Sequence, residues 1–232
     1  MNQDYEKICS LIAEEELELL EDAYEEYAAE MEDALENAVA KIRFAQHAIE
    51  RSSAKRNLIC DISWRVKEFI STVTKCDRKE YEFSIDSVKK NVLDVGGIRI
   101  VTPFKDDVFA VVEIIRNILG IKVLDEKDYI NNPKPNGYKS YHMHILIGLY
   151  SPVIKDVVFY PIEIQIRDKS MDFWATLEHI LNYKQDASEE AQAKFKQIAD
   201  ALEAISTITI GLRDSKKANI EADQGESSSV LT

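Results

Sequence analysis

The sequence predicts an α/β fold: a mixed β-sheet of about five strands flanked by helices, with helical extensions at both ends. Strand-like and helix-like runs alternate between residues 62 and 184. No glycine or proline precedes Gly96, and apolar residues make up 45% of the 232 positions, enough for a sizeable core. We therefore expect an N-terminal helical extension (1–57), a central domain (58–184), a C-terminal helix (185–217) and a disordered polar tail (218–232).

In the first half of the chain, the predicted elements are as follows in order. Residues 4–50 are predicted as helix because apolar residues from Met31 to Ile49 recur at steps of three and four. Residues 62–73 mix β-branched and aromatic residues with cations, which we interpret as a short strand or loop. A helix over 84–92 would be capped by Ser84. Residues 92–102 form a strand whose glycine pair allows a bulge or a close backbone approach.

The second half continues the pattern. Residues 106–119 are an amphipathic helix that ends at Gly120, and residues 121–124 are a strand. Two longer strands, 141–150 and 157–167, are joined by a turn. Helices follow over 171–184 and roughly 188–215.

Charge and cysteine usage limit the classes of function. Residues 1–50 carry 15 acidic and 3 basic side chains, whereas residues 51–184 carry 18 acidic and 21 basic ones, within a net charge of −13. Such a field repels duplex nucleic acid, so a small phosphate-bearing ligand in the middle third is the better prediction. Three cysteines without a CxxC spacing fit a reducing compartment. With no signal peptide or transmembrane run visible, we expect a cytoplasmic protein and no membrane partner.

The stretch NPKPNGYKSYH, residues 132–142, is unusually rich in cations and aromatics for a connecting loop. Two prolines and Asn-Gly predict a stiff turn. Lys134 and Lys139 offer ammonium groups to phosphates, Tyr138 offers a ring on which a nucleobase can stack, and His142 follows at once. A surface hairpin with incidental lysines is the alternative.

Two strands carry candidate groups for chemistry. In PIEIQIR, residues 161–167, isoleucines alternate with Glu163, Gln165 and Arg167, so the three polar side chains share one face. Asp94 precedes the glycine pair and could hold Mg²⁺, and Arg99 could contact a base or a phosphate. A solvent-facing edge strand and ordinary turn chemistry are the respective alternatives.

A basic cluster precedes these strands. Its members could clamp a polyphosphate or form a solvated face; they are Arg65, Lys67, Lys75, Arg78 and Lys79. Histidines 142 and 144 have no third ligand at a usual spacing, which argues against zinc. In the helix over 171–184, Asp172 lies near the start, where the helix dipole favours a carboxylate.

In their order along the chain, RVK, Lys75, DVGGIRI, YINNPKPNGYKSYH, EIQIR and MDFWATLEHILNYK resemble the synthetase domain of the RelA/SpoT family over residues 58–184. The length is similar to that of a single-domain small alarmone synthetase. The chain departs from the usual pattern in three places: Asp168 replaces a threonine, EFIST follows RVK, and DVGGIRI replaces the commoner DIAGIRI.

The resemblance implies a GTP diphosphokinase, which transfers pyrophosphate from ATP to the 3′-hydroxyl of GDP or GTP with Mg²⁺ and gives (p)ppGpp and AMP. It implies that Arg65 and Arg99 hold adenine, that Lys67 and Lys75 hold ATP phosphates, and that Asp94 and Glu163 bind the metal, with Glu163 also activating the hydroxyl. The implied GDP/GTP-binding residues are Lys134, Tyr138, Lys139, His142, Gln165 and Asp172.

Other readings stay open at this point. The chain could be a non-catalytic guanine-nucleotide or RNA-binding regulator, or a pyrophosphotransferase with a different acceptor, because stacking on Tyr138 tolerates any base. Single-stranded RNA is therefore left open as a partner. The terminal helices and the resemblance predict a homo-oligomer, a homotetramer.

Overall fold

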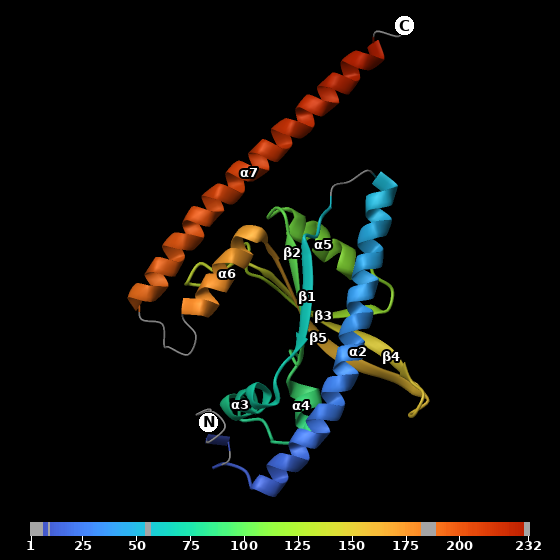
Figure 1. Cartoon of the computed structure of the whole chain (residues 1–232), viewed down its shortest axis with the longest axis vertical. Coiled ribbons are helices and arrows are strands. Elements are labelled where there is room, and N and C mark those ends of the chain that lie inside the picture. Colours follow the sequence, from blue (N-terminus) through green and yellow to red (C-terminus); the bar gives the residue numbers. More distant parts are fainter. Residues whose placement is uncertain (1–6, 9, 54–56, 182–188, 230–232) are drawn as a thin grey trace.

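A mixed sheet forms the centre of the computed structural model, which describes residues 7–8, 10–53, 57–181 and 189–229 (Figure 1). Its five strands lie in the order β1–β2–β5–β4–β3. Only the pair β2–β5 is parallel; the other neighbouring pairs are antiparallel. The predicted fold class is confirmed. The strands are β1 (Asp61–Val66), β2 (Gly96–Thr102), β3 (Ile121–Asp128), β4 (Tyr141–Ser151) and β5 (Asp156–Asp168).

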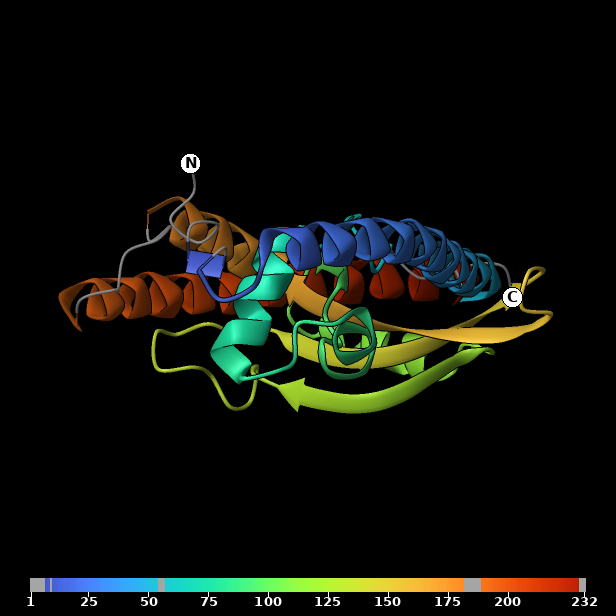
Figure 2. The same cartoon turned by 90° about the horizontal axis from the view of Figure 1, so that it is seen from below.

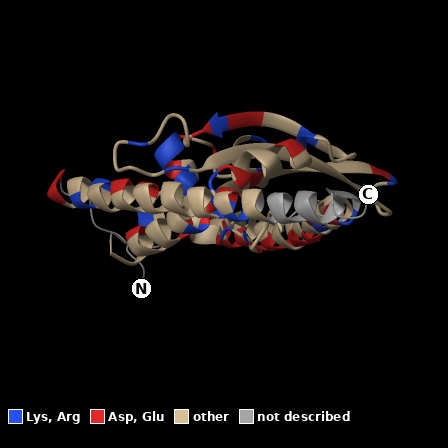
Figure 3. Ribbon diagram, turned by 90° about the horizontal axis from the view of Figure 1, so that it is seen from above, with Lys and Arg blue, Asp and Glu red and all other residues tan. Residues whose placement is uncertain are grey.

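Helices cover the sheet and extend beyond it. Figures 1 and 2 show the long α2 crossing the sheet, the hairpin of β4 and β5 projecting past the other strands, and α7 running away from the body. Figure 3 shows the acidic residues crowded along α2, as the composition of residues 1–50 predicts. The helices are α2 (Glu14–Ser53), α3 (Phe69–Lys79), α4 (Ile85–Asn91), α5 (Asp107–Arg116), α6 (Lys169–Leu181) and α7 (Glu189–Ser229).

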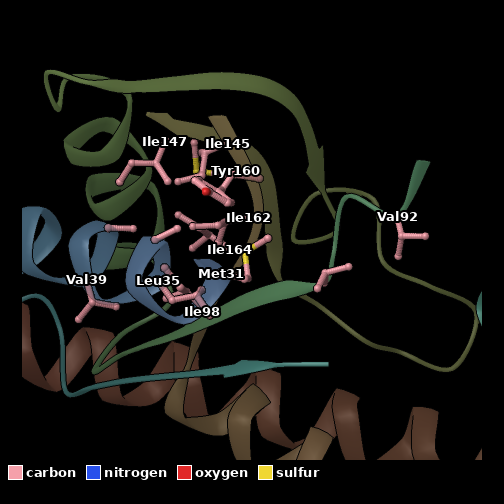
Figure 4. Packing of buried hydrophobic residues seen from close by; sticks show 14 of the residues in the cluster. Met31, Leu35, Val39, Val92, Ile98, Ile145, Ile147, Tyr160, Ile162 and Ile164 are labelled. Carbon is pink, nitrogen blue, oxygen red and sulfur yellow. The ribbon is translucent and has the colours of Figure 1, made fainter. Parts of the chain in front are cut away.

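The main core lies between the sheet and α2, with α5 beside it (Figure 4). Met31 and Leu35 of α2 are fully buried against isoleucines that alternate along β2, β4 and β5. The approach is so close that a Cβ at Gly96 would lie 2.5 Å from the sulfur of Met31. Each such buried side chain contributes about 1.5–3 kcal/mol. Gly96 therefore allows a close helix–sheet contact on this face.

The prediction for residues 62–73 is wrong beyond β1. The structure has a helix, α3, from Phe69, because Phe69, Thr72, Val73 and Cys76 fall at helical spacing and are all buried. Strand-forming β-branched residues are overruled here by tertiary packing. The helix ends at Glu80, which takes the left-handed conformation with φ of 56°.

The other helix predictions mostly stand. Ser84 caps α4, since its hydroxyl oxygen accepts a hydrogen bond from the Ser87 backbone N–H. The first long helix begins at Glu14 rather than at residue 4, after a turn at residues 10–12. Residues 182–184 of the predicted 171–184 helix lie outside the described residues.

The prediction of a disordered tail over 218–232 differs from the structure, which continues α7 to Ser229. This stretch is polar but contains no proline, and its alanines and glutamates are good helix formers. Polar composition therefore does not separate a solvated helix from disorder here; residues 230–232 lie outside the described range. Among the described helices, none is long and apolar enough to cross a membrane.

Candidate active site

The sheet face opposite α2 carries the polar side chains. Arg65 pairs with Gly97, Gly97 pairs with Glu163, and Arg99 pairs with Gln165 across β1, β2 and β5. Directly paired residues share a face, and the intervening isoleucines are buried on the other side. Gly97 has only the Arg65 carbonyl near the place of a Cβ, at 3.9 Å, so it leaves open space between Arg65 and Glu163.

This face forms the floor of a cavity of about 720 Å³, which α6 and the 132–142 segment also line. The volume is typical of a small-molecule site. Nine of the twelve residues selected from the sequence line it: Arg65, Lys67, Asp94, Arg99, Lys134, Tyr138, His142, Glu163 and Gln165. These nine residues come from four separate stretches of the chain, which the fold brings to one place.

Asp94 lies at the β1–α3 side of the cavity and is held by two lysines. Its carboxylate accepts hydrogen bonds from Lys67 Nζ at 2.7 Å and Lys75 Nζ at 2.6 Å. Burial raises the pKa of Asp94, but the two ammonium groups together outweigh burial and the net pKa lies below its ordinary value. Lys75 does not itself line the cavity; it reaches Asp94 from α3.

The backbone around Lys67 fixes this arrangement. The Lys67 N–H donates to the Val95 carbonyl at 2.8 Å, and the Tyr24 hydroxyl of α2 donates to the Lys67 carbonyl at 2.5 Å. Tyr24 also meets the Thr72 hydroxyl at 3.0 Å. Helix α2 therefore anchors the segment that carries Lys67, although none of the residues lining the cavity comes from α2.

Glu163 is held by its neighbours on β4 and β5. His142 Nδ1 lies 3.2 Å from one carboxylate oxygen, and Gln165 Nε2 donates to the other at 2.8 Å. Burial raises the pKa of Glu163, but the hydrogen bonds from His142 and Gln165 lower it by more. The net pKa lies below its ordinary value, so the carboxylate form is favoured. The negative charge of Asp94 opposes ionisation and acts to raise the pKa of Glu163, but less than these hydrogen bonds lower it.

These two carboxylates suit a magnesium ion that is held jointly by the protein and by a bound polyphosphate. Mg²⁺ prefers oxygen ligands and is often held by one or two carboxylates together with substrate phosphates. Within the described part of the chain, no group of three or more His, Cys, Asp or Glu side chains gathers that could hold a metal. The donor set therefore suits a metal that arrives with a polyphosphate rather than one enclosed by protein alone.

In the loop over residues 132–140, the Tyr138 ring is covered, whereas the sequence predicts a ring that is open to a stacking nucleobase. The side chain is 8% exposed, and its ring packs 5.8 Å from that of Trp174. The ammonium group of Lys134 lies 5.0 Å from the ring centre. The Tyr138 hydroxyl and His142 Nε2 are 3.0 Å apart. A base could therefore stack on this ring only after Lys134 or Trp174 moves.

Lys139 and Asp172 lie outside the cavity lining. Lys139 Nζ pairs with Glu203 of α7 at 2.9 Å. Asp172 accepts a hydrogen bond from Arg167 Nε at 2.9 Å and forms an ion pair with Arg167 Nη2 at 2.7 Å, and Arg99 Nε is 3.9 Å away. Their expected contacts with a guanine nucleotide stay predictions.

Sequence reasoning left out some residues that line the cavity. Arg167 shares the polar face of β5, so the alternation of PIEIQIR already indicated its direction. Trp174 is only 1% exposed and packs in a small apolar cluster, yet it also borders the cavity. Glu178 of α6 borders it too, and no sequence signal singled it out.

Comparison with known families agrees with this geometry. Residues 64–188 match the family described as a region found in RelA / SpoT proteins, which is more than half of the chain. The chain belongs to the RelA/SpoT family. It is 34% identical over 151 residues to the GTP pyrophosphokinase YwaC of Bacillus subtilis, covering 64% of this chain and 71% of that protein. It is 35% identical over 148 residues to YjbM of the same organism, covering 63% and 67%.

Solved structures of family members share the fold. The small alarmone synthetase 1 from Bacillus subtilis bound to its product pppGpp superposes with a TM-score of 0.74 at 27% identity, covering 83% of this chain and 97% of that one. The protein smu.1046c from Streptococcus mutans gives a TM-score of 0.73 at 30% identity, covering 84% and 97%. The sheet and the flanking helices are therefore the common scaffold of this family.

Proposed function

We propose that this protein is a GTP pyrophosphokinase, a small alarmone synthetase that makes (p)ppGpp from ATP and GDP or GTP. One observation carries the proposal. Asp94 and Glu163, 69 positions apart in the chain, line one cavity together with the cations expected around two nucleotides. The relatives at 34% and 35% identity are GTP pyrophosphokinases, and a pure binding protein has no evident need of paired carboxylates beside phosphates.

We assign ATP to the β1–α3 side of the cavity. Arg65 and Arg99 lie on neighbouring strands and present planar guanidinium groups suited to stacking on adenine. Lys67 and Lys75, held by Asp94, provide the positive charge that phosphate oxygens require. When bound, Mg²⁺ would be held by Asp94 and Glu163 and would neutralise charge on the phosphates.

We assign the acceptor nucleotide to the opposite side. Tyr138 would stack on guanine once its ring is uncovered, with Lys134 and His142 near phosphates and ribose. Gln165 and Asp172 would lie on the guanine side. Phosphoryl transfer depends mainly on charge neutralisation and in-line positioning, which such a cleft can supply.

Glu163 is the group that receives the proton in this scheme. The acceptor's 3′-oxygen forms a bond to the β-phosphorus of ATP as the bond from that phosphorus to the α,β-bridging oxygen breaks, and AMP leaves. The proton of the 3′-hydroxyl passes to the Glu163 carboxylate, which His142 and Gln165 orient and keep ionised.

Product analysis tests the function. With Mg²⁺, ATP and GDP or GTP, the protein should release AMP and not ADP. Glu163→Gln should lower kcat by about 10²–10⁴-fold, the usual contribution of a general base, while nucleotide binding measured by calorimetry is largely retained. If no AMP is released with GDP, GTP, adenosine nucleotides or an RNA 3′ end, a non-catalytic nucleotide- or RNA-binding regulator becomes the better hypothesis. If AMP is released only with adenosine nucleotides or only with an RNA 3′ end, the protein is a pyrophosphotransferase with a different acceptor.

The protein's assembly and location extend the same proposal. Exposed Ile205, Ile208 and Leu212 along α7 support a homo-oligomer, with a tetramer as the predicted state, which light scattering would test. Action in the cytoplasm stays a prediction from the sequence.

A further inference from the structure

Helix α7 touches the loop over residues 132–140 where the loop leaves no room for a side chain. Gly137 has a φ of +88°, and a Cβ there would lie 2.6 Å from Ala199 Cβ and 3.3 Å from Lys196 Cα. Ala199 is completely buried at this contact. Glycine is thus required both by backbone conformation and by the closeness of α7, and any side chain larger than alanine at 199 would push the loop away.

An ion pair fixes the same loop to the same helix, one turn further along α7. Lys139 Nζ lies 2.9 Å from Glu203 Oε2, and the Lys139 side chain is only 16% exposed. Glu203 also pairs with Lys105, which precedes α5. One carboxylate therefore ties two separate loops of the central domain to α7, and Lys139 is directed to α7 rather than to the cavity lining.

A chain of contacts leads from this attachment to Glu163. Trp174 Nε1 donates to the Phe195 carbonyl of α7 at 2.8 Å, and the Trp174 ring packs against Tyr138. Tyr138 meets His142, whose other ring nitrogen faces Glu163. A shift of α7 against the loop would therefore alter the positions of Tyr138 and His142.

We propose that α7 positions the 132–140 loop, through Ala199 against Gly137 and Glu203 against Lys139, and thereby sets the affinity for the acceptor nucleotide without touching it. This inference rests on the proposed function, because it takes the loop as the acceptor's binding site. Ala199 and Glu203 are positioning residues. Lys139 is a docking group for α7 and not a ligand of the acceptor's phosphates.

The two roles of Lys139 predict opposite effects of one substitution. If Lys139 docks the loop, Glu203→Gln loosens the loop and raises the KM for GDP or GTP. If Lys139 were a phosphate ligand held back by Glu203, the same change would free it and lower that KM. A partly exposed charge pair contributes modestly, so the expected increase in the acceptor KM is about two- to fivefold.

The experiment compares steady-state kinetics and hydrogen exchange in the full chain. Glu203→Gln and Ala199→Val should raise the acceptor KM and speed amide exchange over residues 132–140, with the KM for ATP unchanged. Glu203→Asp should recover part of the loss. Asp200→Asn is the matched control: it removes the same charge from the same helix, but among the described residues Asp200 forms its ion pair with Lys196, in an exposed contact four residues away.

A double substitution sharpens the result. Lys139→Met should match Glu203→Gln, and combining them should add little, because each removes the same contact. Unchanged exchange in the Glu203→Gln protein, a lowered acceptor KM, or equal effects on ATP and acceptor would each overturn the proposal. Exchange needs no turnover, so an inactive wild type would refute the proposed function while the docking of the loop on α7 would still be judged by exchange.

Discussion

The two sides of the cavity are held by different forces. On the β1–α3 side, Asp94 is fixed by charge, through Lys67 and Lys75. On the other side, Tyr138 is fixed by packing, in a small apolar cluster with Trp174 and Phe195 that is separate from the main core. The difference teaches that loss of charge at Asp94 should damage the first side and loss of volume around Trp174 the second, so substitutions at these two places can separate the sides.

The largest effect in this comparison is expected at Asp94. Asp94→Asn removes the counter-charge of two lysines and half of the proposed metal-binding pair, so kcat/KM should fall by about 10²–10³-fold. Binding of GDP, measured by calorimetry, should change little. Asp77→Asn is the matched control, since the Asp77 carboxylate pairs with the exposed Lys7 and lies outside the cavity lining. A loss of GDP affinity as large as the loss of kcat/KM would contradict the claim that Asp94 acts on the ATP side of the cavity alone.

Phe195 tests the packed side. Phe195→Ala removes the ring that packs on Trp174 and should raise the acceptor KM by about tenfold, with loss of up to about 3–5 kcal/mol of stability. The KM for ATP should stay within a factor of two. Phe173→Ala, a change of the same size at a side chain 54% exposed, provides the control in thermal unfolding. A parallel rise in both KM values would show that the two sides are one unit.

The pH dependence of stability tests how much the Glu203 carboxylate stabilises the acceptor side of the cavity. Burial raises the pKa of Glu203, but hydrogen bonds from Lys105 and Lys139 outweigh it, and the net pKa lies below that of the unfolded chain, about 4.3. Its contribution is therefore present above that pH and lost as the pH falls through the folded pKa. The difference in Tm between wild type and Glu203→Gln should shrink from pH 7 to pH 3. A difference that is constant across this range would contradict the charge pair.

The smallest effect is expected where neither side is touched. Lys194 and Glu190 form an exposed pair four residues apart on α7. Lys194→Ala should change the free energy of unfolding in urea by no more than about 0.5 kcal/mol and leave both KM values unchanged. A larger change in the acceptor KM would mean that the start of α7 also acts on the loop.

Local patterns were enough to predict much of the site. The alternation of PIEIQIR placed Glu163 and Gln165 on one face, and the structure has the intervening isoleucines fully buried. Helix α3 was missed because its β-branched residues favour a strand locally, and only burial against α2 and the sheet selects the helix. Lys139 was predicted to bind phosphates because it lies in a loop that resembles a nucleotide-binding loop. Nothing in the sequence near Lys139 indicates that its partner is Glu203.

The sequence by itself determined the strand periods and the family motifs, because each of these depends on residues close together in the chain. Tertiary structure alone decided that Tyr138 is covered and that Lys139 meets Glu203, 64 residues away. Such contacts join segments whose sequences carry no mutual pattern, so only the packing of α6 and α7 against the loop brings them together.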